Sequence, residues 1–427
     1  MKTVKIGFLG LGTVGSGAYS ILADNSGSIA KKVGARIEVA GILVRDAGKK
    51  RMADVDQGLF TTRPEDILEN DEIDIIVEVM GGIDPAREYV IWGMKKGKSV
   101  VTANKDMVSQ YGKDLFRAAD ENGVDLLFEG SVAGGIPIIR PLKYCLAANR
   151  LKSVMGIING TTNYMLTKMT REGTDFAEVL KEAQQKGYAE SDPSADVEGF
   201  DAARKLSILA SIAFNTRVTQ DDVYTEGITR ISREDIAYAR ELNYLVKLLG
   251  IAKDTGDGVE VRVHPCFIPV SHPLASVNDV YNAIFVRGDA VGDVMFYGRG
   301  AGDMPTGSAV AADIMEAARN RAKNITGINC TCYEDKEVKQ IGETESKYYL
   351  RLKVEDRPGV LASIAYALGE NNVSIASVLQ KHTDGSNAEI VLITHRVMEK
   401  NMQNALMIIE RLPSTGEICN LIRVEGD

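Results

Sequence analysis

A glycine-rich turn between a short apolar strand and a helix constrains the fold of this chain more than any other feature. Val4–Leu9 has the pattern of a strand, Gly10-Leu11-Gly12-Thr13-Val14-Gly15 follows it, and a helix is predicted over Thr13–Ala23. In a G-x-G-x-x-G turn, the glycines allow the tight turn, the approach of backbone to a pyrophosphate, and close helix packing. The helix N-terminus then faces the phosphates. The turn predicts a dinucleotide site at Gly10, Gly12, Thr13, Val14 and Gly15.

Short strands and helices alternate through the first 130 residues. Further strands are predicted at Arg36–Val44, Ile73–Val79, Ser99–Thr102 and Val124–Phe128, with helices at Pro85–Lys96 and Gln110–Glu121. Alternation of this kind is typical of a parallel sheet covered by helices on both faces. Residues 1–130 are therefore predicted to form a doubly wound, Rossmann-like NAD(P)-binding domain of the α/β class.

The remaining chain predicts two more domains, in keeping with its 427 residues. An α+β substrate and dimerisation domain is expected over 131–330, and the helix over 305–323 could return to the first domain. Its predicted helices are Pro137–Ala148, Thr161–Arg171, Phe176–Lys186, Asp201–Phe214 and Arg233–Leu249, mixed with strands Ser153–Ile158 and Val259–Val263. After a polar linker at Glu334–Lys347, residues 345–427 follow the ferredoxin-like order βαββαβ, with a turn at Thr383–Asn387.

Charge and hydropathy argue against nucleic-acid and membrane partners. Fifty basic and fifty-nine acidic side chains give a formal net charge of −9, so phosphate-backbone binding has no general electrostatic drive. Apolar runs stay shorter than a membrane span. The N-terminus runs directly into a strand pattern instead of a signal peptide, and a cytoplasmic location is expected.

The numbers and positions of the cysteines and histidines limit which disulfide, metal and proton-transfer sites are expected. The five cysteines are odd in number and scattered, which is not a disulfide framework, and Cys330-Thr331-Cys332 lacks a second pair nearby for a metal or redox site. Only four histidines are present, so proton transfer is expected to depend on Lys, Asp, Glu or Tyr.

Cofactor preference is set at the end of the second strand, where Arg45 precedes Asp46. Arg45, with Lys49, Lys50 and Arg51 close behind, favours NADP, whereas Asp46 keeps NAD open; Arg45 could also be a plain surface charge. The third and fourth strands end in Glu78-Val79-Met80-Gly81-Gly82 and Thr102-Ala103-Asn104-Lys105. Carboxyl ends of parallel strands face the ligand, so cofactor contacts are expected at Gly81, Thr102 and Lys105.

Acidic residues are densest between Gly187 and Lys205. Asp201 and Lys205 are spaced i, i+4 on a predicted helix and could form a simple surface ion pair. A lysine held beside carboxylates can instead donate the proton that the scarce histidines would otherwise supply.

These motifs resemble the homoserine dehydrogenase family, in order and through the first 325 residues. Besides the segments above, the match includes Gly130-Ser131-Val132-Ala133-Gly134-Gly135-Ile136-Pro137, Gly156-Ile157-Ile158-Asn159-Gly160-Thr161-Thr162-Asn163 and Gly298-Arg299-Gly300-Ala301-Gly302. The resemblance implies NAD(P)-dependent interconversion of L-homoserine and L-aspartate 4-semialdehyde, in threonine, methionine and isoleucine synthesis.

The resemblance also implies residue roles. Lys205 would be the proton donor, Lys105 a second lysine near nicotinamide and substrate, and Asp201 part of the catalytic group. Substrate contacts are implied at Glu190, Asp196, Asp201, Gly160 and Thr161; carboxylates suit the α-ammonium group of homoserine. Gly302 would close over the cofactor. A sodium ion would bind Glu129 and the carbonyl groups of Val132, Gly134 and Ile136.

The third domain resembles ACT regulatory domains, with Asp356-Arg357-Pro358-Gly359-Val360-Leu361 after its first strand. Such domains pair and bind an amino acid near this loop, which implies regulatory contacts at Asp356, Gly359, Val360 and Leu361. Threonine is the expected inhibitor, isoleucine or methionine the alternative, and an ACT domain that serves only oligomerisation remains open. A homodimer or homotetramer of a monofunctional enzyme is expected, without an aspartate kinase segment.

Two competing functions remain open at this point. Another dinucleotide-dependent aldehyde or imine reductase would share the first domain but use a different substrate. A non-catalytic sensor would bind NADP(H) in the first domain and an amino acid in the third.

Overall fold

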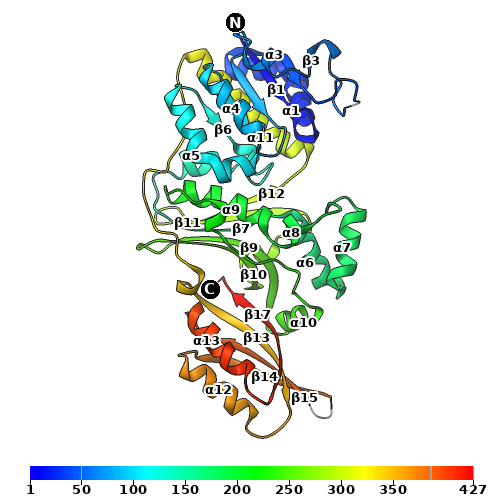
Figure 1. The fold of residues 1–427 in the computed structure, drawn as a ribbon, viewed down its shortest axis with the longest axis vertical. Coiled ribbons are helices and arrows are strands. Elements are labelled where there is room, and N and C mark those ends of the chain that lie inside the picture. Colours follow the sequence, from blue (N-terminus) through cyan, green and yellow to red (C-terminus); the bar gives the residue numbers. More distant parts are fainter. Residues whose placement is uncertain (50, 385–386, 427) are drawn as a thin grey trace. The chain divides into compact units, whose positions relative to one another are not determined.

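The computed structural model describes residues 1–49, 51–384 and 387–426 and divides into two compact units (Figure 1). Unit 1 comprises residues 1–154, 204–223 and 281–336. Unit 2 comprises residues 155–203, 224–280 and 337–427. Lys50 and the tip of the predicted turn, residues 385 and 386, lie outside the described residues. The three-domain boundaries expected from sequence stay a prediction.

Unit 1 contains a six-stranded parallel sheet in the order β3-β2-β1-β4-β5-β6. Its strands are β1 (Lys2–Leu9), β2 (Ala35–Leu43), β3 (Phe60–Thr61), β4 (Ile75–Glu78), β5 (Ser99–Thr102) and β6 (Leu126–Leu127). The order reverses between β1 and β4, and in open parallel sheets ligands bind at the carboxyl ends of the strands beside such a reversal. The prediction of a doubly wound Rossmann-like domain is confirmed.

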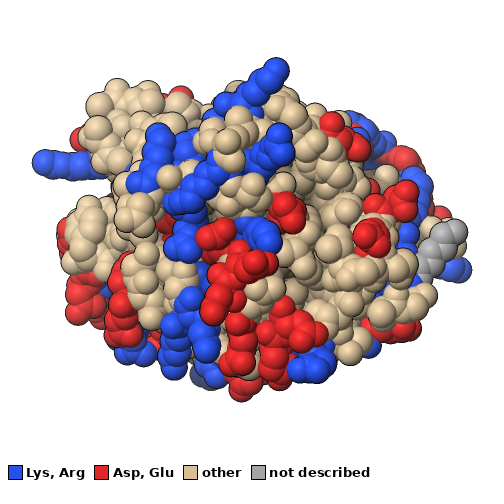
Figure 2. Space-filling model, turned by 90° about the horizontal axis from the view of Figure 1, so that it is seen from above, with Lys and Arg blue, Asp and Glu red and all other residues tan. Residues whose placement is uncertain are grey.

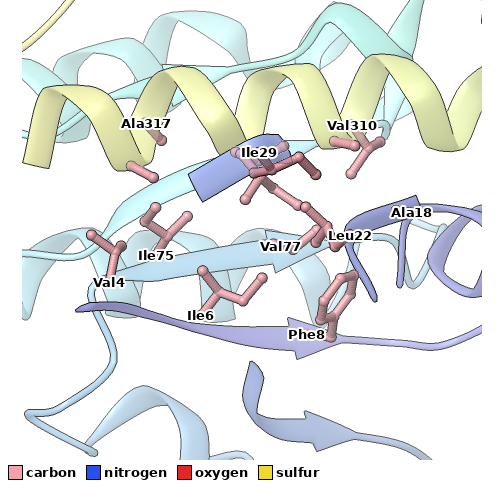
Figure 3. Packing of buried hydrophobic residues seen from close by; sticks show 14 of the residues in the cluster. Val4, Ile6, Phe8, Ala18, Leu22, Ile29, Ile75, Val77, Val310 and Ala317 are labelled. Atoms are coloured by element: carbon pink, nitrogen blue, oxygen red, sulfur yellow. The ribbon is translucent and has the colours of Figure 1, made fainter. Parts of the chain in front are cut away.

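Helices cover this sheet because their apolar residues recur on one face. They are α1 (Thr13–Asp24), α2 (Ser26–Val33), α3 (Glu65–Leu68), α4 (Ala86–Lys95), α5 (Lys105–Glu121) and α11 (Asp303–Lys323). Val310 and Ala317 of α11 are fully buried against the strand residues Ile75 and Val77, as Figure 3 shows. A Cβ on Gly17 of α1 would lie 2.3 Å from the Asp303 carbonyl oxygen, so α1 and α11 meet backbone to backbone. α11, which begins 290 residues after the start of α1 (residue 303 against residue 13), thus completes the first core.

The rest of unit 1 corrects one predicted helix. The predicted helix Pro137–Ala148 is only partly correct: residues 139 and 140 are α-helical and continue into a π turn over Pro141–Cys145, whereas residues 146–148 lie outside the helix. The backbone N–H groups of Ile138, Ile139 and Arg140, at the start of this short helix, donate to the Glu129 carboxylate. Sequence analysis also omitted an antiparallel hairpin in this unit, β11 (Tyr281–Gly288) with β12 (Gly292–Arg299). Short 3-10 turns occur at Gln57–Leu59, Glu129–Ser131 and Gln220–Asp222.

Two elements run across the boundaries between the units, namely β7 (Leu151–Ile157) and α9 (Phe200–Ala213). The other elements of the first part of unit 2 are α6 (Gly160–Glu172), α7 (Phe176–Gln185), α8 (Ser194–Val197), β8 (Tyr224–Thr225), α10 (Arg233–Glu241), β9 (Tyr244–Asp254), β10 (Val259–Pro269) and the turn Pro273–Ser276. The predicted helix Arg233–Leu249 is wrong beyond Glu241. Asn243 has φ +61°, which ends the helix, and the apolar run that follows is a buried strand.

The C-terminal part of unit 2 confirms the order βαββαβ. After the turn Ile341–Glu343, its elements are β13 (Glu345–Glu355), α12 (Val360–Glu370), β14 (Ile375–Asp384), β15 (Asn387–Thr394), the short β16 (Val397–Met398), α13 (Glu399–Glu410) and β17 (Thr415–Val424). The strands of unit 2 join in the order β9-β10-β17-β13-β15-β14. Cys266 and Phe267 of β10 pair with Arg423 and Val424 of β17, so the last strand of the chain belongs to the same sheet as β9 and β10.

The surface carries both charges. Figure 2 shows Lys and Arg side chains next to Asp and Glu side chains on one face of the molecule. Within the described residues, none of the helices combines the length and apolar character needed to cross a membrane.

Candidate active site

Each glycine of the turn between β1 and α1 has a different structural role. Gly10 has φ +95°, and a Cβ on it would lie 3.0 Å from the Val79 carbonyl oxygen. A Cβ on Gly15 would lie 3.0 Å from the Val79 side chain, so this glycine lets α1 pack against the end of β4. A Cβ on Gly12 would meet none of the described atoms within 4 Å. Gly12 therefore leaves room for a ligand to reach the backbone.

A cavity of about 820 Å³ opens beside this turn. Its lining includes Gly10–Thr13, Ser16, Leu43–Asp46, Lys49, Arg51, Met52, Thr62, Pro64, Val79, Met80, Pro85 and Tyr89. Gly12 is the N-cap of α1 and has no side chain to accept from the first-turn N–H groups, which suits them to bind an anion. The volume is that of a cofactor site.

Positive charge gathers at the end of β2. Arg45, Lys49 and Arg51 line the cavity together with one carboxylate, Asp46. Oδ1 of Asp46 accepts a hydrogen bond from Gly48 N at 2.8 Å, within its own loop. Nη2 of Arg51 donates to the Asp46 carbonyl oxygen at 2.5 Å. Three cations against one internally bonded carboxylate make this end of the cavity suitable for a phosphate group.

The ends of β4 and β5 are joined by a buried polar chain. Oε2 of Glu78 accepts from Thr102 Oγ1 at 2.6 Å, and Thr102 Oγ1 accepts from Asn104 N at 3.0 Å. Nδ2 of Asn104 donates to the Gly82 carbonyl oxygen, and its Oδ1 caps α5 at Met107 N. Burial raises the pKa of Glu78. Thr102 is thus fully buried in a positioning network, and neither it nor Gly81 belongs to the described cavity lining.

The two candidate lysines both belong to unit 1 and lie on neighbouring helical segments. Lys105 is the first residue of α5, and Lys205 lies on α9. Ser109 Oγ and Ser207 Oγ are 2.7 Å apart, and Arg204 Nε lies 3.1 Å from Asp106 Oδ1. Each of these contacts lies within about one helical turn of a lysine. Lys105 and Lys205 therefore lie at matching positions along α5 and α9.

A single amide orients two of the predicted substrate acids. Nδ2 of Asn159 donates to Asp196 Oδ1 at 2.7 Å and to Asp201 Oδ2 at 2.9 Å. Its Oδ1 accepts from Thr162 N at 2.9 Å and caps α6. Asn159 had no role among the sequence-based predictions, although an asparagine directly before a predicted helix is the signal of an N-cap. Asp201, one helical turn before Lys205, is buried.

The other predicted substrate residues lie near this amide or at the surface. Gly160 begins α6, and Thr161 Oγ1 donates to the Tyr188 carbonyl oxygen at 2.7 Å. Glu190 is exposed, and its carbonyl accepts from Gln184 Nε2. The remaining cofactor candidates, Val14, Gly15, Lys105 and Gly302, do not belong to the described cavity lining; Gly302, with φ +130°, is the N-cap of α11.

Glu129 is buried in a polar cluster with Arg140, Asp313 and Glu316. Its carboxylate accepts from Ile138 N, Ile139 N and Arg140 N at 2.6–2.8 Å. Asp313 accepts from Glu129 N, and Arg140 pairs with Asp313 and Glu316. Burial and the Glu129 charge raise the pKa of Asp313 to about 8. The Arg140 guanidinium therefore pairs with two carboxyl groups, Asp313 and Glu316, and Glu129 is bound by backbone N–H groups.

The loop after Glu129 contains the other predicted sodium ligands. Val132, Gly134 and Ile136 are buried, and Ala133 and Gly134 have φ of +56° and +48°. The carbonyl oxygens of Val132, Gly134 and Ile136 accept no hydrogen bond from another described residue. Buried carbonyl groups are normally paired, so a hard cation fits this donor set.

The loop at 356–361 joins β13 to α12. Gly359, with φ +91°, is the N-cap of α12, and Arg357 Nε pairs with Glu355 at 2.6 Å. Asp356 and Leu361 are exposed, whereas Val360 is buried in the domain core. The Val360 side chain therefore supports the loop from inside.

Family models match the chain in three consecutive segments. Residues 10–129 match the NAD-binding domain of homoserine dehydrogenase, residues 137–315 match homoserine dehydrogenase, and residues 348–414 match the ACT domain. The resemblance inferred from the motifs is confirmed.

Individual homoserine dehydrogenases are similar in sequence to all or most of this chain. Homoserine dehydrogenase of Bacillus subtilis (strain 168) is 41% identical over 430 residues, which cover 100% of this chain and 99% of the relative. A solved homoserine dehydrogenase from Thiobacillus denitrificans is 43% identical, with a TM-score of 0.94, and the match covers 100% and 99% of the two chains. A hyperthermophilic archaeal homoserine dehydrogenase solved with NADPH is 28% identical over 74% of this chain and 97% of its own, with a TM-score of 0.63. The chain therefore belongs to the homoserine dehydrogenase family of oxidoreductases.

Proposed function

We propose that the protein reduces L-aspartate 4-semialdehyde to L-homoserine with NADPH, reversibly. The observation that carries the proposal is the acid pair Asp196 and Asp201, held by Asn159, with Lys205 one turn further along α9. NADPH, when bound beside the glycine turn, supplies the hydride that adds to the aldehyde carbon.

The residues of the chain bind and orient the substrate and move the proton. Asp196 and Asp201 pair with the α-ammonium group, and exposed Glu190 adds a third carboxylate at the edge. Lys205 donates a proton to the oxygen of the aldehyde as negative charge develops there. Lys105 holds that oxygen or the nicotinamide in place. The product is an alcohol, and the reverse reaction returns the proton to Lys205.

The test is an assay with NADPH and L-aspartate 4-semialdehyde, followed by the absorbance of the reduced nicotinamide. We expect NADPH oxidation with formation of homoserine. Succinate semialdehyde is the matched control because it keeps the aldehyde and a carboxylate but lacks the ammonium group. Its kcat/KM should be lower by at least about 100-fold, since it offers the acid pair no ammonium group to bind. Oxidation with neither aldehyde would favour a sensor, and equal rates would favour a reductase of other aldehydes.

NADPH is the proposed cofactor because Arg45, Lys49 and Arg51 surround the ribose end of the cavity. Arg45→Glu should lower the ratio of kcat/KM for NADPH to that for NADH by about 10–100-fold, the range expected for a charge-assisted hydrogen bond. Arg63→Glu, at an exposed position outside the described lining, is the control and should leave the ratio unchanged. A wild-type preference for NADH would overturn the assignment.

Sodium is the proposed ligand of the loop after Glu129, because its unpaired carbonyl groups adjoin an excess of carboxyl groups. The ion would brace this loop and take no part in proton transfer. In the same assay, replacing sodium chloride by tetramethylammonium chloride should lower activity and the unfolding temperature together. Unchanged values in sodium-depleted buffer would contradict the proposal.

Regulation through the ACT domain is supported by a chain of contacts within unit 2. Arg423 of β17 pairs with Glu226 at 2.9 Å. Two residues further on, Ile228 N donates to the Val197 carbonyl oxygen at 2.8 Å, and Val197 directly follows Asp196. We propose that threonine, an end product of the pathway, binds paired ACT domains of a homodimer or homotetramer and acts on the acid pair by this route.

The corresponding prediction is that threonine inhibits the enzyme through the loop at 356–361. Asp356→Ala should raise the threonine concentration for half inhibition at least about 10-fold, since the loop loses a partner for the effector's ammonium group. Glu370→Ala, exposed at the far end of α12, should behave as wild type. Inhibition by isoleucine or methionine instead would change the effector, and insensitivity to all three would leave oligomerisation as the role of the domain.

A further inference from the structure

Two cysteines lie together in the segment that follows α11. Cys330 and Cys332 are both partly exposed, whereas Cys266 is fully buried. Their segment is tied to the end of α9, since Glu334 N donates to the Asn215 carbonyl oxygen and Lys336 N to Thr216 Oγ1. The active-site proposal above uses neither cysteine.

The sulfur of Cys330 is surrounded by donors. Arg217 Nη2 lies 3.2 Å and the Cys332 backbone N 3.4 Å from Cys330 Sγ. Lys143, itself buried, donates to the carbonyl oxygens of Ile328 and Asn329, directly before Cys330. These groups lie around a small cavity whose other walls, from α5, α9 and Phe128, present only apolar or hydroxyl side chains. Among the described residues that line this cavity, the charged side chains are the cations Lys143 and Arg217.

Such surroundings stabilise a thiolate. Hydrogen bonding from the Cys332 thiol and backbone, together with the Arg217 and Lys143 charges, lowers the pKa of Cys330. The same hydrogen bond and burial raise the pKa of Cys332, which stays a thiol. These directions favour a thiolate at Cys330 and a thiol at Cys332.

A metal ion fits this pair poorly. Thiophilic cations need more ligands or an anionic site, and here two cations adjoin the sulfurs. Within the described residues, His, Cys, Asp and Glu side chains do not come together in groups of three or more. A thiolate beside a guanidinium is instead suited to attack a peroxide, since the guanidinium stabilises the negative charge that leaves with the departing oxygen.

We propose that Cys330 and Cys332 are a hydroperoxide-reactive dithiol that closes to an intramolecular disulfide. The Cys330 thiolate attacks one oxygen of hydrogen peroxide, the O–O bond breaks, and sulfenic acid and hydroxide form. The Cys332 thiol then attacks the Cys330 sulfur, an S–S bond forms, and water leaves with the thiol proton. Overall the peroxide is reduced by two electrons and the two sulfurs are oxidised by two; a reducing thiol reverses the change.

The position of this dithiol connects it to the catalytic helix. Cys332 Sγ donates to the Ser211 carbonyl oxygen of α9 at 3.7 Å, and Arg217 follows the same helix. Ser211 Oγ in turn donates to the Ser207 carbonyl oxygen, half a turn beyond Lys205. A disulfide removes the anionic partner of Arg217 and the thiol contact of Ser211. The chemistry of the dithiol is independent of the proposed reaction and is measured without substrate.

The first experiment measures the reactivity of the reduced full-length protein. Alkylation of each cysteine by iodoacetamide is followed by peptide mass spectrometry across a pH series. Cys330 should react with an apparent pKa below the ordinary value of about 8.5. Exposed Cys145, alkylated in the same samples, is the internal reference. Arg217→Gln should raise the apparent pKa of Cys330, whereas Arg150→Gln, an exposed control, should not. An apparent pKa at or above that of Cys145 in the wild type would refute the proposal.

The second experiment uses hydrogen peroxide. The wild type should lose two hydrogen atoms in mass, located in the peptide with Cys330 and Cys332, and dithiothreitol should restore them. Cys332→Ser should stop at a sulfenic acid that dimedone captures on Cys330, and Cys330→Ser should leave Cys332 unmodified under the same conditions. Oxidation of the wild type only to sulfinic acid, or disulfides only between chains, would contradict the intramolecular step.

Discussion

Lys205→Ala is expected to lower kcat for aspartate semialdehyde reduction by about 10²–10⁴-fold, the contribution of a positioned general acid. The binding constant for NADPH should change little, because Lys205 does not belong to the described lining of the cofactor cavity. Steady-state kinetics give kcat, and fluorescence titration with NADPH gives the binding constant.

The control for this substitution is Lys181→Ala, an exposed lysine on α7. It should keep wild-type kcat and unfolding temperature. Lys205→Ala with near-normal kcat would exclude the lysine as proton donor, while loss of both NADPH binding and folded structure would make its role structural. A full decrease in kcat with cofactor binding retained would also reject a non-catalytic sensor.

Arg423→Met is expected to have the largest effect on stability. The guanidinium is buried and forms two bonds of 2.9 Å with Glu399 and one of 2.9 Å with Glu226. Removing one partner of a buried ion pair leaves an uncompensated charge and costs about 3–5 kcal/mol. Urea unfolding of the wild type and the variant measures the difference. Lys353→Met, which breaks the exposed pair with Glu417, is the control and should cost at most about 1 kcal/mol.

The pH dependence of this effect has a defined sign. Burial alone would raise the pKa of Glu399, but Arg423 and its hydrogen bonds lower it below the ordinary value. A carboxyl group with a lowered folded-state pKa stabilises the protein above its unfolded pKa, and this stabilisation is lost as the pH falls through the folded value. Without Arg423, burial raises the pKa of Glu399, so the carboxyl group takes up a proton more readily in the variant than in the wild type. The stability difference between wild type and Arg423→Met should therefore shrink as the pH falls through the acidic range. A difference that grows with acidity would show that Glu399 is not the group responsible, and Arg423→Met/Glu399→Gln should recover part of the loss at neutral pH.

The strands and helices in the first and last parts of the chain could be predicted from sequence because different local sequence features indicate the same structure there. The glycine turn, the apolar strands and the helix caps all favour one arrangement in Gly10–Gly15 and around Gly359. Prediction failed where one signal was ambiguous. The apolar run of β9 fits a buried helix as well as a buried strand, and only the left-handed Asn243 and the pairing with β10 decide between them.

The candidate site likewise contains some residues that the sequence predicts and some contacts that only the structure shows. Residue types and spacing were sufficient to propose Asp201, Lys205 and the cofactor turn. Asn159, which joins Asp196 to Asp201 over 37 and 42 residues, and the Ser109–Ser207 contact over 98 residues could not be read from local pattern. Such contacts depend on how distant segments pack.

Sequence alone determined the family, the parallel sheet, the ACT order and the candidate lysines, because these follow from local periodicity and from motifs of contiguous residues. Tertiary structure decided which side chains and strands become neighbours. Thr102 lies in a buried network with Glu78, and backbone N–H groups surround Glu129. Arg217 and Lys143 lie beside Cys330, and β17 pairs with β10. The physical reason is that burial and opposite charge act through space, so the ionisation and reactivity of a side chain depend on neighbours that are far away in the chain.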